Sequence, residues 1–272
     1  MTLSPGLICF SPTRTTRRIV EAVSEGLQAV DERWIDLTPP EIADPRFRGD
    51  LAVIATPVHA GRLPPIMVSR FRRLRGDGVP AVIIVVYGNR AYDDALLELR
   101  DVAVEAGFRP IAAGAFIGEH SFSSTGTLIA AGRPDAEDLQ KARAFGATLQ
   151  DRVAQNRALD RIDLVRVPGR FPYRELRTLP GVAPTTHRRL CTGCNECVAA
   201  CPVGAIPASD PASATSGACI ACCACVKRCS AGARLIDDSR IRRGAEQLAI
   251  TCRARKEPET FVGSSSGLGS GS

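Results

Sequence analysis

The stretch Cys191-Thr-Gly-Cys194-Asn-Glu-Cys197-Val-Ala-Ala-Cys201-Pro202 decides the fold of the C-terminal half of this 272-residue chain. Its four cysteines are separated by two, two and three residues, and a proline follows the last one. The same spacing returns in Cys219-Ile-Ala-Cys222-Cys-Ala-Cys225-Val-Lys-Arg-Cys229-Ser230. Every cysteine of the first run repeats 28 positions later, and Gly204 repeats as Gly232. These repeats predict an internal duplication with pseudo-twofold symmetry.

Thiolates at this spacing are typical of [4Fe–4S] clusters, where three neighbouring cysteines wrap one cluster and the fourth reaches across to the other. Structural zinc and a disulfide framework are the alternatives. Zinc sites usually come as separated Cys-x2-Cys pairs rather than as four thiols in one run. We therefore predict two [4Fe–4S] clusters, which suit a reducing compartment such as the cytoplasm.

Three further cysteines have no place in the repeated spacing. Cys9 lies in an apolar strand pattern and is predicted to be a small core residue. Cys223 adjoins Cys222 and is either an alternative ligand or a neighbour of the ligands. Cys252 follows an apolar stretch, and nothing marks it as reactive.

The composition, 44% hydrophobic and 24% charged, is that of an ordinary globular protein, and the length predicts two domains. The first ten residues lack the basic region of a signal peptide. The longest apolar run, 79–87, is too short to cross a bilayer as a helix. We therefore expect a soluble, cytoplasmic protein that does not bind membranes.

Much of the net charge of +6 comes from residues 161–190, which hold seven arginines against two carboxylates. A solvated linker is one interpretation, and a docking surface for an acidic redox partner protein is the other, because complementary charge speeds encounter. We do not expect nucleic acid as a partner, because the segment lacks interleaved aromatic residues for base stacking.

The N-terminal half alternates apolar, β-rich runs with longer amphipathic segments. The predicted strands are 3–10, 33–37, 51–55, 81–87 and 110–117. The predicted helices are 16–29, 66–74, 91–107 and 135–156. This order indicates an α/β fold with right-handed crossovers, a parallel sheet and helices on both faces.

The first strand-to-helix turn, Ser11-Pro12-Thr13-Arg14-Thr15-Thr16, contains four hydroxyls in six residues. Free backbone N–H groups at a helix start favour an anion, and hydroxyls add donors around phosphate oxygens. The turn is neither a G-x-G-x-x-G fingerprint nor a P-loop. Hydroxyls are also common helix caps, so this turn alone leaves both interpretations open.

Two further loops follow predicted strands at their carboxyl ends, where open α/β sheets bind ligands. They are Thr56-Pro57-Val58-His59-Ala60-Gly61-Arg62-Leu63-Pro64 and Tyr87-Gly88-Asn89-Arg90-Ala91-Tyr92-Asp93-Asp94. Aromatic faces flank a planar ring system well, and Gly88 allows a close backbone approach. The alternative is that both tyrosines only pack in the core.

With these loops and the two cysteine runs, residues 3–240 resemble the family of single-chain flavodoxin–ferredoxin fusions. The resemblance implies a flavodoxin-like, five-stranded parallel doubly wound sheet, followed by a small α+β bacterial ferredoxin domain with two clusters. The expected parts are a flavodoxin-like domain (1–160), a basic linker (161–183), the ferredoxin domain (184–240) and a C-terminal extension (241–262). The Gly/Ser-rich tail 263–272 is typical of an expression tag and is set aside.

The resemblance also implies the residues that hold the cofactors. The phosphate of FMN is expected on the first loop, at Ser11, Pro12, Thr13, Arg14, Thr15 and Thr16. Its isoalloxazine is expected between Thr56, Pro57, Val58, His59, Ala60, Gly61 and Tyr87, Gly88, Asn89, Arg90, Tyr92. One cluster is expected on Cys191, Cys194, Cys197 and Cys229, and the other on Cys219, Cys222, Cys225 and Cys201.

Three positions depart from the family pattern. Arg14 stands where flavodoxins usually have glycine, which predicts either a distorted phosphate loop or a guanidinium that neutralises phosphate. The loop after the third strand has His59 and no tryptophan, and Ser230 replaces the proline of the second run. Residues 116–124 are long for a connection and are expected either to line the flavin pocket or to contact the ferredoxin domain.

Flavin and clusters together predict an electron-transfer protein in which two clusters relay single electrons between a partner and FMN. The alternative is an FMN-dependent reductase of a small organic acceptor, such as a quinone, fed by its own clusters. A third hypothesis is a flavin-free docking domain attached to a ferredoxin. No acid/base pair stands at a diagnostic spacing, so no catalytic residue is predicted.

Overall fold

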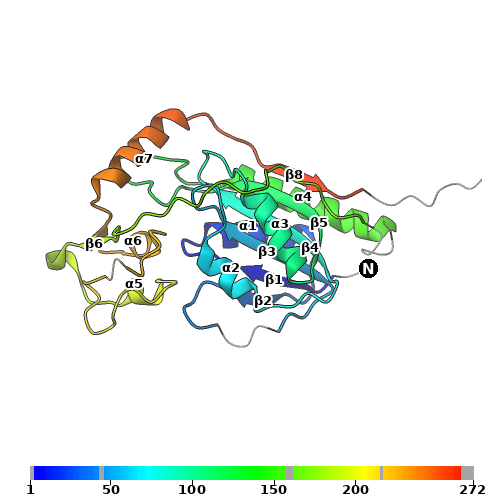
Figure 1. Ribbon diagram of the computed structural model, residues 1–272, viewed down its shortest axis with the longest axis horizontal. Coiled ribbons are helices and arrows are strands. Elements are labelled where there is room, and N and C mark those ends of the chain that lie inside the picture. The colour runs from blue at the N-terminus through cyan, green and yellow to red at the C-terminus, as the bar shows by residue number, and fades with distance from the viewer. Residues whose placement is uncertain (1–2, 43–45, 157–161, 215–216, 265–272) are drawn as a thin grey trace, which may run out of the picture.

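The computed structural model describes residues 3–42, 46–156, 162–214 and 217–264. The N-terminal part is an α/β domain, and the two cysteine runs form a smaller unit beside it (Figure 1). Arg161 of the predicted linker and residues 265–272 of the predicted tag lie outside the described residues.

One six-stranded sheet has the order β2-β1-β3-β4-β5-β8. Its strands are β1 (Pro5–Cys9), β2 (Arg33–Asp36), β3 (Leu51–Pro57), β4 (Pro80–Tyr87), β5 (Arg109–Ile117) and β8 (Glu259–Val262). The first five are parallel, as predicted, and their order is that of flavodoxin-like folds. The sixth, β8, was not predicted: it comes from the C-terminal extension and pairs antiparallel with β5.

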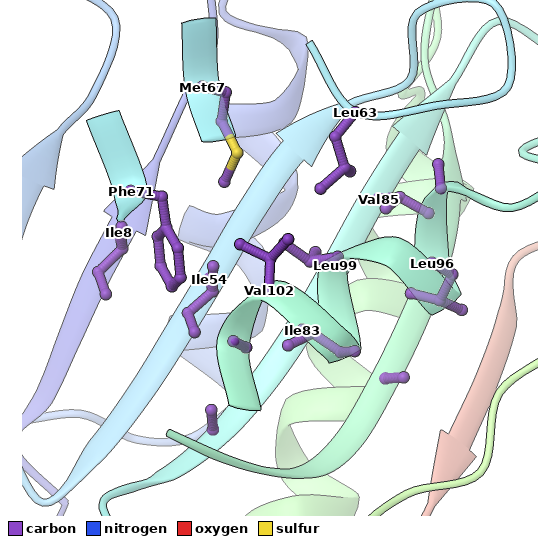
Figure 2. Close-up of a cluster of buried hydrophobic side chains, with 14 of the residues drawn as sticks. Ile8, Ile54, Leu63, Met67, Phe71, Ile83, Val85, Leu96, Leu99 and Val102 are labelled. Atoms are coloured by element: carbon purple, nitrogen blue, oxygen red, sulfur yellow. The ribbon is translucent and has the colours of Figure 1, made fainter. Parts of the chain in front are cut away.

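Four helices cover the two faces of the sheet, as predicted. They are α1 (Thr15–Gly26), α2 (Pro65–Phe71), α3 (Ala95–Glu105) and α4 (Ala136–Asn156). One buried cluster joins α1 and α4 to the sheet. A second joins α2 and α3 to the other face, where Figure 2 shows Phe71, Leu99 and Val102 beside strand residues. The apolar run of β4 is almost wholly buried, as expected of a central parallel strand.

The cysteine-rich unit has little regular structure. It contains the two-stranded antiparallel sheet of β6 (Thr185–Thr186) and β7 (Arg234–Leu235), a 3-10 turn η2 (Arg188–Leu190), α5 (Glu196–Ala199) and α6 (Ala224–Lys227). Asn195 and Cys223, which precede the two short helices, both have a φ of 60° in the left-handed region. Because these residues are 28 positions apart, the sequence duplication is also a structural repeat.

Two connections join this unit to the large domain. The first is the basic segment, which lies beside α3. The backbone N–H groups of Arg170 and Arg174 donate to the Asp94 carboxylate at 3.0 and 2.7 Å, and Tyr173 donates to Asp101 at 2.6 Å. The predicted solvated linker is therefore held by the acidic side chains of its own domain.

The second connection follows α7 (Ser239–Thr251) and returns along the large domain to β8 (Figure 1). We call residues 252–258 the return segment. None of the described helices is long and apolar enough to span a membrane.

Candidate cofactor sites

The eight repeated cysteines lie on the walls of two neighbouring cavities. The inner cavity is lined by Cys201, Cys219, Cys222 and Cys225. The outer cavity is lined by Cys191, Cys194, Cys197 and Cys229. Each cavity therefore takes three cysteines from one run and the fourth from the other, which is the grouping that the resemblance implies.

This arrangement fits iron–sulfur clusters. All eleven cysteines are free, so the alternative of a disulfide framework is not realised. Within the described ranges, no three His, Cys, Asp or Glu side chains converge closely enough to hold one metal ion. In a [4Fe–4S] cluster each iron takes one thiolate, so the four sulfurs surround a body rather than a point. Four cysteines around a cavity match that geometry better than they match a single zinc ion.

Backbone N–H groups point at the cysteine sulfurs in both halves of the repeat. Ala205 donates to Cys201 Sγ and Ala233 donates to Cys229 Sγ, each at 3.2 Å. Ala221 donates to Cys219 Sγ at 3.4 Å. Hydrogen bonds to the sulfurs stabilise thiolates and help to set cluster potentials.

The two cavities differ in burial. Three cysteines of the inner cavity are at most 9% exposed, whereas Cys194 of the outer cavity is exposed. Burial raises the pKa of Cys222 to about 12 and that of Cys225 to about 11. These thiols therefore keep their protons until a cation replaces them, as iron does when a cluster binds.

The inner cavity adjoins the flavodoxin-like domain. Ile220 on its wall also packs against the core of the sheet. The carbonyl of Pro202, also on the wall, accepts a hydrogen bond from Arg70 Nη2 at 2.6 Å. Arg70 is buried on α2 and donates as well to the carbonyls of Leu37 and Thr38. Sequence reasoning missed Arg70, because nothing local distinguishes it from the surface arginines.

Residues 116–124 contact the cysteine-rich unit, one of their two expected roles. Lys227 of α6 donates to Glu119 Oε1 at 2.6 Å and to the carbonyl of Ser123 at 2.7 Å. Phe122 packs on a buried cluster that contains Ala221. This region therefore forms part of the junction between the domains.

The hydroxyl loop lies at the carboxyl end of β1, before α1. The Arg17 N–H donates to Ser11 Oγ at 3.1 Å, and the Thr13 and Thr15 hydroxyls are 2.7 Å apart. Arg14 has a φ of 65°, the left-handed conformation that glycine adopts at no cost. Arg14 thus supplies the backbone geometry of the usual glycine, and its side chain is exposed. Pro12 and Thr16, within the loop, are buried. The hydroxyls stand at the N-terminus of α1, a position that favours a phosphate.

The 56–61 loop turns tightly against its neighbour. Thr56 is fully buried, whereas Pro57, Val58 and His59 are half-buried. Ala60 and Gly61 have positive φ, and a Cβ at Gly61 would come within 2.2 Å of Asp93, so this turn abuts the 87–94 loop. Burial lowers the pKa of His59 to about 4, which leaves its imidazole neutral at pH 7.

The two tyrosines of the 87–92 loop pack against each other. The rings of Tyr87 and Tyr92 pack edge to face, 5.4 Å apart, and both residues lie in the core at 4% and 8% exposure. This packing is what the alternative of two core tyrosines predicts. Gly88 approaches the ring of His120, since a Cβ there would lie 2.3 Å from it. Arg90 pairs with Asp93.

The return segment covers this loop. The Asn89 side chain donates to the carbonyls of Cys252 and Ala254, at 2.6 and 2.9 Å. Tyr92 donates to Glu259, at the start of β8, at 2.9 Å. These contacts join residues more than 160 positions apart, so the residues near the loop gave no signal of them.

The other cysteines fall in two environments. Cys9 is buried in β1, as predicted for a core residue. Cys223 is 3% exposed and lines the inner cavity beside Cys222. The half-buried Cys252 contributes its carbonyl to Asn89.

Comparisons with known proteins give one family match and several similar solved structures. The 4Fe-4S binding domain family matches residues 184–206. Similar solved structures include an archaeal flavodoxin (13% identity; 55% of this chain and 99% of that chain; TM-score 0.37). A WrbA-like flavodoxin from Agrobacterium tumefaciens is 17% identical, over 57% of this chain and 99% of that chain, with a TM-score of 0.39. Flavodoxin 1 from Bacillus cereus is 15% identical, over 53% of this chain and 95% of that chain, with a TM-score of 0.38. No curated protein matches the sequence. The strand order, rather than these scores, identifies the fold.

Proposed function

We propose that this chain, a flavodoxin-like domain fused to a ferredoxin-type 4Fe–4S segment, relays single electrons between an external partner and FMN through two clusters. The observation that carries the proposal is the placement of the two four-cysteine cavities. The outer cavity has an exposed cysteine, and the inner cavity adjoins the flavodoxin-like domain. Both cavities share Arg234 on their walls, so they are immediate neighbours.

The hydroxyl loop supports a phosphate site for FMN. Ser11, Thr13 and Thr15 present hydroxyls at the N-terminus of α1, where the helix end favours negative charge. Bound FMN supplies the capacity to exchange electrons singly or in pairs. The chain contributes a junction that holds the inner cavity against the flavin domain, through Arg70 and Lys227.

An acidic redox protein is the external partner that the charge pattern favours. Arg166, Arg177 and Arg189 are exposed in the basic segment 162–190. Complementary charge would speed the encounter of the two proteins, and this effect would become weaker at high salt. Such a partner would reach the outer cavity, where Cys194 is exposed.

A second candidate is a flavin-free docking domain attached to a two-cluster ferredoxin. The observation that favours it is the cover over the 87–92 loop, where Tyr87, Asn89 and Tyr92 pack or bond within the protein. In this case, the hydroxyl loop is an ordinary helix start.

The deciding experiment is the FMN, iron and sulfide content of anaerobically purified protein, with and without added FMN. About one FMN and about eight irons per chain are expected for the relay. Iron without flavin, even after FMN is added, would contradict the relay and support the docking domain.

Photoreduction followed by rapid spectroscopy then tests the route. Cys194→Ala is expected to slow delivery of electrons to FMN, while Cys252→Ala, which alters a cysteine outside both cavities, serves as the control. Unchanged delivery in Cys194→Ala would overturn the relay. Fast turnover of a quinone by the reduced protein, without a protein partner, would instead indicate the reductase.

A further inference from the structure

Arg234 breaks the symmetry of the duplicated unit. Counting 28 positions back from Arg234 gives Ile206, which follows the fourth cysteine of the first run at the same distance. Both residues are 4% exposed. One half of the repeat thus buries an aliphatic side chain where the other half buries a guanidinium. Ile206 lines only the inner cavity, whereas Arg234 lines both.

The Arg234 guanidinium is only partly satisfied by the protein. Its Nη2 donates to the carbonyls of Pro211 and Ser213, at 3.0 and 2.6 Å. Its Nη1 is 3.8 Å from Cys225 Sγ. The buried Nε has no hydrogen-bond partner in the described part of the chain, and neither has the hydroxyl of Thr186, which pairs with Arg234 across the small sheet. A buried donor without an acceptor is costly, and such groups call for an explanation.

The guanidinium of Arg234 reaches a ligand of the inner cavity. Its Nη1 lies 3.8 Å from Cys225 Sγ, and Cys225 lines the inner cavity. No carboxylate of the described residues forms an ion pair with Arg234, so its positive charge is not neutralised within the protein.

We propose that Arg234 makes the two clusters unequal, by donating hydrogen bonds to sulfur and by raising the reduction potential of the inner cluster. The inference rests on the proposed function, since it requires both clusters. Reduction adds one negative charge to a cluster, and a cation in a buried, weakly polar site stabilises that charge strongly. Electrons are thereby drawn from the outer cluster toward the flavodoxin-like domain.

Arg234→Gln removes the charge and leaves a shorter, polar side chain. An EPR-monitored redox titration of the iron-loaded full chain is expected to show two one-electron steps. In the variant, the higher potential falls, with about a tenfold or larger change in the reduction equilibrium, or ~59 mV. Arg228→Gln is the matched control: it removes an exposed charge beside Cys229, and solvent screens such a charge.

Iron content separates the possible failures. Wild-type protein with fewer than about eight irons would overturn the proposed function itself. Full iron loading with both potentials unchanged in Arg234→Gln would overturn only the inference about Arg234.

A second variant and a second measurement apply if Arg234→Gln fails to assemble clusters. Arg234→Lys keeps the charge but not the forked donors, so its higher potential is expected between those of the wild type and the Gln variant. In wild-type protein with ¹⁵N-labelled arginine side chains, pulsed EPR of the reduced clusters is expected to detect a ¹⁵N coupling. Absence of that coupling would show that no arginine nitrogen donates to a cluster sulfur, and it would overturn the proposal.

Discussion

Arg14 holds a backbone conformation that favours glycine, with a φ of 65° at the start of α1. A side chain with a Cβ pays for this conformation, although glycine has more freedom to lose on folding. We expect Arg14→Gly to stabilise the flavodoxin-like domain by about 0.5–1 kcal/mol, measured by urea unfolding followed through Trp34 fluorescence. Gln28→Gly, at a φ of 53° outside the loop, should give a similar gain. A loss of stability in both variants would show that neither backbone is strained.

Two histidines make stability depend on pH. Burial lowers the pKa of His59 and of His120 from 6.5 to about 4. The unfolded chain therefore takes up protons first as the pH falls from 6.5 toward 4, and stability that is complete above 6.5 is lost across this window. Between pH 7 and 5.5 we expect a loss on the order of 1 kcal/mol per histidine, seen in urea midpoints.

His120→Asn provides the comparison for this pH effect. The variant removes one titrating group, so its pH dependence should be weaker than that of the wild type. Equal slopes in both proteins would contradict the assignment to His120.

The return segment depends on one side chain of the 87–92 loop. Asn89 is 3% exposed, donates to two carbonyls of the segment and accepts from the Lys256 N–H at 3.3 Å. Asn89→Gly removes these bonds but tolerates the φ of 64°. We expect the free energy of unfolding to fall by about 1–3 kcal/mol. Hydrogen exchange should become faster in residues 252–262 and stay unchanged around the eight repeated cysteines. Unchanged exchange in 252–262 would show that β8 holds the segment alone.

The elements differ in how well sequence predicts them. Strands β1 to β5 can be predicted from local apolar runs. The cluster ligands can be predicted because cysteines only two or three residues apart can bind the same cluster. Strand β8 has four residues and no alternating pattern of burial, so only its pairing with β5 reveals it. The sequence predicts the sheet edge at which Tyr87 and Tyr92 lie, but the carboxylate that binds Tyr92 comes from the far end of the chain.

At the scale of the whole molecule, the cysteine-rich unit has a very small core. One buried cluster within it consists of Cys197, Cys201, Ala205, Ile206 and Cys225, so three of these five residues are cysteines. Such small units depend on bound metal for much of their folding free energy. We expect oxidative removal of iron to abolish slow hydrogen exchange in 185–235 while β1–β5 stay protected. Persistent protection of 185–235 without iron would contradict this dependence.

The pairing of β8 with β5 makes the cysteine-rich unit an insertion rather than an appendage. The chain leaves the sheet after β5, passes through α4 and the basic segment, and comes back to the same sheet beside the strand that it left. The unit is thus joined to the large domain by two connections, the basic segment and the return segment. A single protease cut in either connection would leave the two parts of the chain joined, so both connections must be cut before the cysteine-rich unit is released.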